Sequence, residues 1–356
     1  MRHQSVARRW IRAIRLLAAL PLIPSRATGQ QIPPSLAQFL QDNIELTPSE
    51  MQTATTGTPV VKVLETPDKL EITVFGIVRI DAPRAFYVAR ATDYRESLRR
   101  PGRLNFGLFS DPPVAADVAN LSLRHSDVEE LERCRPGSCK LKLSADAMAR
   151  LRAQLDSAPA AADSVVNAVV RERVLQYVTA YRARGNQALV VYADQRAVTS
   201  AEDVFHRMLA RSPYLYEYTP ALERYLKNYP EDRPPGISET LFWSQDDIPG
   251  LSPTITINHA LVYSPPELAG STLIVSKLLY ADHYLDGALE LSAVVDQPDQ
   301  QPSGIYRVSV RRFHFDNLSN AGPINVRAKA TAKFRDDTRT MLTETKVRTE
   351  RAYRPS

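Results

Sequence analysis

The chain has 356 residues, of which 44% are hydrophobic, with 45 Lys or Arg residues against 40 Asp or Glu residues and two cysteines. A chain of this length and apolar content can bury one large core or two smaller ones. The formal net charge is +5, but it derives largely from arginines in residues 1–29, and the remainder is nearly neutral. Nucleic-acid binding, which needs a clustered basic face with stacking aromatics, is therefore not indicated.

Residues 1–29 have the features of an export signal in the expected order. Arginines at positions 2, 8, 9, 12 and 15 come first, the apolar run Leu16–Ile23 follows, and small residues end the segment. This run is far shorter than the ~20 residues that a membrane-spanning helix needs. We therefore expect a cleaved signal, a mature protein without a stable membrane span, and a periplasmic or secreted location. The alternative is an arginine-rich amphipathic first helix that is retained.

Both cysteines lie in ERCRPGSCKLKL, residues 132–143, where Cys134 and Cys139 enclose Pro136-Gly137. Haem attachment needs C-x-x-C-H, a pattern that these cysteines do not form. A structural zinc site needs four ligands, and only His125 lies near the pair. A redox pair of the C-x-x-C type requires a thiolate near a helix start, but the Pro-Gly pair predicts a turn. The remaining interpretation is a disulfide that closes a tight loop in an oxidising compartment, with no metal and no other cofactor.

Residues 30–66 predict an N-terminal helical arm followed by the first strand. The segments 33–44 and 46–57 have helical composition, and Thr47 before Pro48 is a favourable helix start. Residues 60–65 and 69–81 have the pattern of strands, divided by a turn at 66–68. A helix over 83–100 is expected next, with Pro83 at its start and basic residues at its end.

From about residue 112 to residue 235 the signals are mostly helical, which predicts a large helical insertion. Residues 164–185 carry apolar side chains at helical spacing up to a glycine stop. A single strand is expected within the insertion, at 187–194. The tyrosines of residues 212–230 allow two interpretations: a stacking surface for sugars or lipids, or, as their helical spacing favours, core or groove lining.

Residues 237–315 predict an antiparallel meander. Strand patterns at 237–245, 254–264, 271–280, 283–296 and 303–315 are separated by turns that contain Pro, Gly or Asp. Residues 322–350 alternate as a strand would, but they lack Gly and Pro after Pro323 and are rich in Ala, Arg, Lys and Glu, so we predict a long helix. The predicted fold class is α+β, with a helical insertion and a long C-terminal helix.

The stretch VRIDAPRAFYVARATDY, residues 78–94, is similar to the first strand and helix of the START-like (helix-grip) superfamily. The order of elements over residues 69–95 and 237–347 resembles the same superfamily, and the chain also resembles exported bacterial proteins of unassigned activity. The resemblance implies a START-like domain over 67–350, interrupted by the insertion at about 112–235. It further implies a curved antiparallel sheet that grips the C-terminal helix, with an apolar cavity for a lipid-like or polyketide-like ligand. The size of the insertion puts the usual mouth of that cavity in doubt.

Strand alternation selects the residues that would face such a cavity. His259 and Tyr263 share a face with the apolar residues of the 254–263 strand, and Tyr306, Arg312 and His314 share a face of the last strand. We predict that these five residues bind the ligand, because a few polar groups in an apolar concavity would orient a headgroup. The alternative interpretation is that His259 is a satisfied core histidine and that Arg312 and His314 lie at a solvated strand end.

No catalytic motif is found in the sequence, neither G-x-S-x-G nor H-E-x-x-H, a Walker loop or G-x-G-x-x-G. The predicted function is therefore that of an exported protein that binds a hydrophobic or lipid-like small molecule between the sheet and the C-terminal helix. One alternative is an enzyme that uses the same cavity, with His259, His314 and Arg312 as acid, base or oxyanion partners. Another is an envelope protein that interacts with partners through its tyrosine-rich insertion.

Overall fold

The structure is a computed structural model that describes residues 32–157, 161–247, 251–297, 304–320 and 323–353. The export signal predicted for residues 1–29 lies outside these residues. No helix within the described ranges combines the length and the apolar composition that crossing a membrane requires.

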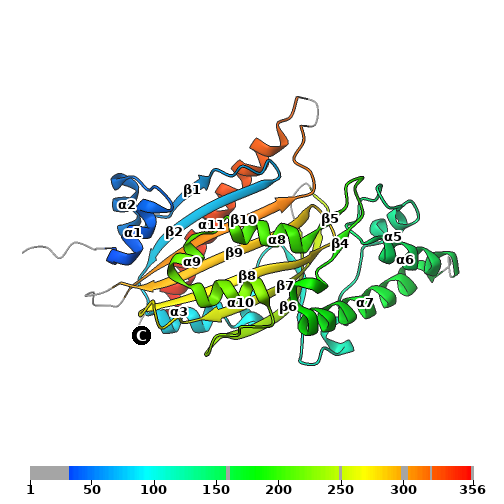
Figure 1. Ribbon diagram of the computed structural model, residues 1–356, viewed down its shortest axis with the longest axis horizontal. Coiled ribbons are helices and arrows are strands. Elements are labelled where there is room, and N and C mark those ends of the chain that lie inside the picture. Colours follow the sequence, from blue (N-terminus) through cyan, green and yellow to red (C-terminus); the bar gives the residue numbers. More distant parts are fainter. Residues whose placement is uncertain (1–31, 158–160, 248–250, 298–303, 321–322, 354–356) are drawn as a thin grey trace, which may run out of the picture.

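An eight-stranded antiparallel sheet forms the centre of the molecule (Figure 1). Its strands are β1 (Val60–Leu64), β2 (Glu71–Ile80), β3 (Arg103–Leu108), β6 (Ser238–Asp246), β7 (Thr254–Tyr263), β8 (Ser271–Ala281), β9 (Leu285–Asp296) and β10 (Ile305–Phe315). They lie in the order β1-β2-β10-β9-β8-β7-β6-β3. All ten residues of β2 are buried, as expected for a strand with apolar residues on both faces.

The long helix α11 (Val326–Tyr353) packs against one face of the sheet, over β1 and β2. The helix lies close to Gly76, where a Cβ atom would be 2.8 Å from Cδ1 of Leu342 and 3.0 Å from Cγ2 of Thr338. Glycine therefore permits the helix backbone to approach the strand. The short helix α3 (Arg84–Ala91) covers β8 and β9. The α+β class and the long C-terminal helix are thus confirmed.

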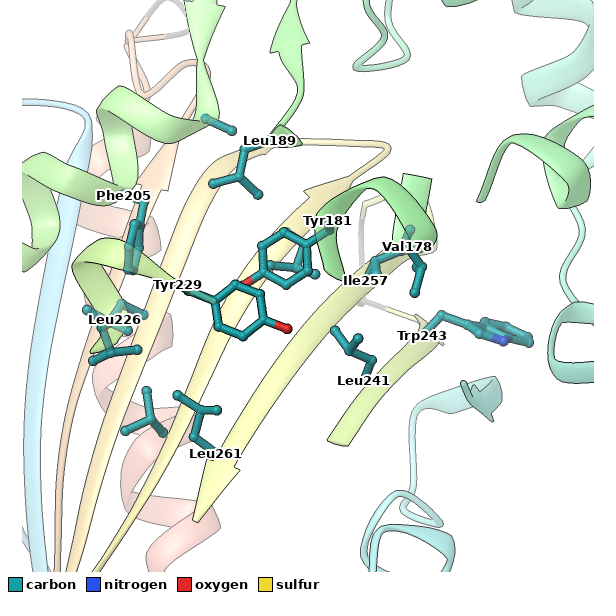
Figure 2. Close-up of a cluster of buried hydrophobic side chains, with 14 of the residues drawn as sticks. Val178, Tyr181, Leu189, Phe205, Leu226, Tyr229, Leu241, Trp243, Ile257 and Leu261 are labelled. Carbon is teal, nitrogen blue, oxygen red and sulfur yellow. The ribbon is translucent and has the colours of Figure 1, made fainter. Parts of the chain in front are cut away.

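The opposite face is covered by the insertion, which connects β3 to its neighbour β6 (Figure 1). The helices of this segment are η1 (Ala115–Val118), α5 (His125–Leu131), α6 (Ala145–Ser157), α7 (Ala162–Arg184), η3 (Gly185–Ala188), α8 (Ala201–Ala210), α9 (Tyr214–Tyr218) and α10 (Pro220–Asn228). Figure 2 shows the core that they form with β6 and β7, including Tyr181, Tyr229, Leu241 and Ile257. Gly185 ends α7 with φ +60°, at a position where a Cβ atom would overlap the carbonyl of Tyr229.

The N-terminal arm consists of α1 (Pro34–Asp42) and α2 (Pro48–Thr55). A capping box begins α2: the backbone N–H of Glu50 donates to Oγ1 of Thr47, and that of Thr47 donates to the Glu50 carboxylate. Leu36 and Leu40 of α1 join a cluster with Phe75. The arm therefore completes the cover of the sheet face opposite α11.

Two predicted elements differ from the structure, and one strand was not predicted. Residues 187–194 contain the end of η3 and only a two-residue strand, β4 (Val191–Tyr192), which pairs with β5 (Thr199–Ser200) outside the main sheet. The expected helix over 83–100 is divided into α3 and α4 (Tyr94–Ser97), because the side chain of Asp93 accepts the N–H of Glu96 and starts a new helix. The edge strand β3 was not predicted, since its RLNFGL sequence alternates only weakly and is held by pairing with β6.

Candidate functional site

All five residues predicted to bind a ligand lie on the sheet face opposite α11. Gly76 faces α11 and pairs with Ser309, so Ser309 faces α11 as well. Side chains alternate along β10, and Tyr306, Arg312 and His314 are an odd number of positions from Ser309, so they point to the other side. A row of paired residues crosses the sheet on that side: Leu261, Val275, Leu291 and Val310. His259 and Tyr263 share the side of Leu261. The insertion and α1, rather than the C-terminal helix, therefore surround the predicted residues.

His259 is buried at the centre of a polar chain between the sheet and the insertion. Its Nδ1 lies 3.0 Å from the hydroxyl of Tyr181, and its Nε2 lies 3.1 Å from Oε2 of Glu239. The hydroxyl of Tyr225 donates to Oε1 of Glu239 at 2.5 Å. Burial lowers the pKa of His259, against the opposing effect of Glu239. Both ring nitrogens and both carboxylate oxygens thus have protein partners.

Glu239 also borders an open polar hollow of about 650 Å³ whose wall includes Arg182, Tyr229 and Arg233. Burial raises the pKa of Glu239, but hydrogen bonds from His259 and Tyr225 outweigh it, so the pKa lies below its ordinary value. These hydrogen bonds favour the charged form of Glu239 over the protonated form.

Arg312 is buried among polar partners between β10 and the insertion. Its Nη1 donates to Oε1 of Glu71 at 2.6 Å, and its Nε donates to Oγ of Ser212 at 3.0 Å. Arg211 binds the other oxygen of Glu71 at 2.8 Å and also binds Asp68 at 3.1 Å. The strand end that carries Arg312 is therefore not solvated, since only 7% of the residue is exposed.

His314 belongs to a neighbouring buried network that contains Lys142. Nδ1 of His314 lies 3.1 Å from Asp286, and Nζ of Lys142 lies 2.7 Å from the other oxygen of the same carboxylate. Lys142 also lies 3.4 Å from Asp194. The pKa of Asp286 lies below its ordinary value, because its interactions with His314 and Lys142 outweigh the effect of burial. The pKa of Asp194 lies above its ordinary value, because burial has the larger effect there. These charges attach the insertion to the sheet.

Tyr263 and Tyr306 lie in apolar clusters. Tyr263 packs with the insertion core and Tyr306 packs with α1. An apolar cavity of about 110 Å³ lies nearby, between α1, α9, α10 and the sheet, and its wall includes Val308 and Val310. This volume is well below the ~300 Å³ at which pockets for drug-sized ligands begin.

A second apolar cavity, of about 350 Å³, lies between α6, α7 and the sheet. We call it the insertion cavity. Its apolar wall is made of leucines from residues 121–151, Val170 and Val174 of α7, and Ile255 and Ile257 of β7. Ile255 and Ile257 lie on the same face of β7 as His259. The face that was predicted to bind the ligand therefore contributes apolar residues to the wall, but His259 and Tyr263 are not part of it. The volume falls within the range for a small ligand.

Three arginines line the insertion cavity. Arg150 of α6 and Arg173 of α7 both bind the Asp146 carboxylate, at 3.0 and 2.7 Å. Arg184, at the end of α7, is exposed. Arg150 and Arg173 share one carboxylate, so the three arginines of the wall carry more positive charge than Asp146 neutralises. Guanidinium groups bind carboxylates and phosphates through paired hydrogen bonds.

Polar groups from β8 form part of the wall beneath the helices. The hydroxyl of Tyr280 donates to the carbonyl of Lys142 at 3.0 Å, and the hydroxyl of Tyr177 from α7 donates to the carbonyl of Leu279 at 2.6 Å. Asp282 follows β8 and accepts the backbone N–H of Ile255 through Oδ1 at 2.8 Å. Burial raises the pKa of Asp282 well above its ordinary value.

The predicted disulfide between Cys134 and Cys139 is present and lies beside the insertion cavity. Cys134 is fully buried in a cluster with Leu131, Leu141 and Leu151, which also line the cavity. Within the loop, the N–H of Cys139 donates to the carbonyl of Asp194. The disulfide therefore positions part of the cavity wall. Among the described residues, no group of three or more His, Cys, Asp or Glu side chains is arranged to hold a metal ion.

Sequence reasoning missed the insertion cavity, although α7 carries a signal for it. Val166, Val174 and Val178 are buried, and Val174 lines the cavity together with Val169, Val170 and Ala180, so apolar side chains cover a wide arc of this helix. A helix that is apolar on more than one face has more apolar surface to bury than contact with a single core can cover.

Neither the protein-family models nor the curated proteins contain a match to this chain.

Proposed function

We propose that the protein binds an anionic amphiphile, with the apolar chain in the insertion cavity and the headgroup at the arginines. The observation that carries the proposal is the combination of an apolar cavity of about 350 Å³ with three arginines in its wall. A pocket with mostly apolar walls and a few placed polar groups is typical of a small-molecule site. The arginines favour a carboxylate or phosphate headgroup.

The expected affinity follows from the apolar wall. Each buried methylene contributes about 0.8 kcal/mol, so a chain of about ten carbons would contribute roughly 8 kcal/mol before the entropy of binding is subtracted. A net affinity in the micromolar range is therefore a reasonable expectation.

This site differs from the one that the START-like resemblance implies, because it lies on the sheet face away from α11. We further propose that the protein acts outside the cytoplasm. The disulfide between Cys134 and Cys139 supports this location, since such bonds persist in oxidising compartments.

A pair of neighbouring substitutions on α7 tests the site. Ala180 lines the cavity, whereas Thr179 next to it is exposed. Ala180→Phe should reduce the affinity of delipidated protein for dodecanoate by tenfold or more, because the ring occupies space in the cavity that the acyl chain would need. Thr179→Phe should leave the affinity unchanged. Isothermal titration calorimetry measures both. Equal affinities in the two variants, or no binding of dodecanoate and no co-purified lipid by native mass spectrometry, would refute the proposal.

A second pair tests the headgroup. Arg184→Gln removes a charge from the cavity wall, and Lys329→Gln removes an equal charge from an exposed site on α11. Arg184→Gln should weaken dodecanoate binding severalfold without changing the binding of dodecanol, and the control should change neither. If both the Arg184 and the Lys329 variant bind dodecanoate as the native chain does, the headgroup does not lie at Arg184.

A further inference from the structure

The carboxyl group of Asp282 is an incompletely bonded polar group in the wall of the insertion cavity. Only 2% of the residue is exposed. Its Oδ1 accepts the N–H of Ile255 at 2.8 Å, whereas its Oδ2 is buried and has no hydrogen-bond partner among the described residues. A buried polar atom without a partner costs about 1–3 kcal/mol, which a ligand that supplies one would recover.

The surroundings indicate which kind of partner is missing. Burial, with a further contribution from the nearby Asp127, raises the pKa of Asp282 well above its ordinary value. Burial thus favours the neutral carboxylic acid over the charged carboxylate. In the acid form, with Oδ1 accepting the N–H of Ile255, Oδ2 carries the hydrogen and needs an acceptor. The wall also contains the hydroxyls of Tyr177 and Tyr280, but neither forms a hydrogen bond with Oδ2.

We propose that Oδ2 of Asp282 donates a hydrogen bond to an oxygen atom on the chain of the bound amphiphile. The inference rests on the proposed function and makes it more specific: the ligand is an oxygenated acyl chain, bearing a hydroxyl or carbonyl group. The headgroup and the chain oxygen are recognised by different walls of the cavity, since the arginines belong to α6 and α7 and Asp282 follows β8.

The test compares dodecanoate with positional isomers of hydroxydodecanoate by calorimetry on the delipidated full chain. At least one isomer should bind about fivefold to tenfold more tightly than dodecanoate, the ratio that one buried hydrogen bond provides. Asp282→Asn keeps a donor and an acceptor and should keep the preference. Asp282→Leu should abolish it.

Infrared difference spectroscopy provides a readout that does not depend on whether Asp282→Leu folds. The C=O band of a protonated carboxyl should be present in the native chain and absent from Asp282→Asn. It should shift when the preferred hydroxydodecanoate binds and stay in place with dodecanoate. Binding of all probes with equal affinity, or a preference that survives in Asp282→Leu, would overturn the role of Asp282 and leave the proposed function standing. Failure of dodecanoate and every isomer to bind would overturn both.

Discussion

Replacement of Lys142 by methionine should destabilise the protein strongly, because it leaves buried carboxylates without their cation. Lys142 is 1% exposed, and its Nζ lies 2.7 Å from Asp286, 3.4 Å from Asp194 and 3.9 Å from Asp316. Methionine keeps most of the volume and removes the charge. Loss of one partner from a buried ion pair costs about 3–5 kcal/mol, and we expect a decrease of this size in the free energy of unfolding at neutral pH.

The pH dependence distinguishes lost charge from lost packing. Without Lys142, the carboxyl groups should hold protons in the folded state at a pH where the unfolded chain has released them. Burial already raises the pKa of Asp316 to about 6 in the presence of the lysine. The folded variant then binds more protons than the unfolded one, so its stability should rise as the pH falls from 7 towards 5. A variant that only lost packing would not gain stability relative to the native chain over this range.

Lys140→Met is the matched control. This lysine lies two positions away, its side chain is 80% exposed, and its ion pair with Glu130 spans 3.3 Å. Exposed pairs contribute about 0–1 kcal/mol. Urea unfolding, followed by circular dichroism at several pH values, measures both variants. If Lys142→Met unfolds within about 1 kcal/mol of the control, the network is not what attaches the insertion to the sheet.

Three further outcomes are expected from stability measurements. Replacing Cys134 and Cys139 together by serine should lower the free energy of unfolding by about 2 kcal/mol, the loop-closure entropy of so short a loop, and a reductant should reproduce the change in the native chain. Leu342→Ala should cost about 2–5 kcal/mol in urea unfolding, because Leu342 is fully buried against Gly76; a smaller loss would mean that α11 packs loosely. Burial lowers the pKa of Lys277 well below 10.5, so the unfolded chain binds that proton more tightly. Stability should therefore rise as the pH increases towards 10.5, and Lys277→Met should lack this rise in unfolding curves recorded at each pH.

The sequence predicted the sheet, apart from its edge strand β3, and the last helix, because these elements have local sequence patterns. The alternating segments between 237 and 315 became β6 to β10 with small changes at their ends. The ambiguous C-terminal segment became α11, since its length and its content of Ala, Lys and Arg suit a helix better than a strand. The strand expected at 187–194 failed because Asn186 and its neighbours form a helical turn that is fixed by tertiary contacts with Leu226 and Lys227.

Alternation could identify which residues share a face, but not which helices cover that face. The shared side of Ile255, Ile257 and His259 was predicted, and the structure has it. The alternation of apolar and polar residues along a strand is the same whether the helix that covers the strand comes from the C-terminus or from the insertion. The partners of His259 lie at positions 181 and 239, and no local pattern connects such distant residues. The relation to the START-like superfamily stays a prediction.

The charges between the sheet and α11 favour the opposite face as the site of the proposed apolar ligand. Glu290 binds Arg311 at 3.1 Å and Arg307 at 3.4 Å on the side of the sheet that faces the helix. Arg311 also donates to the hydroxyl of Thr338 on α11 at 3.3 Å. An acyl chain inserted there would have to separate these groups without replacing their hydrogen bonds, which is costly in a buried site. The leucine, isoleucine and valine side chains of the insertion cavity impose no such cost, and the chain gains hydrophobic free energy by displacing water from them.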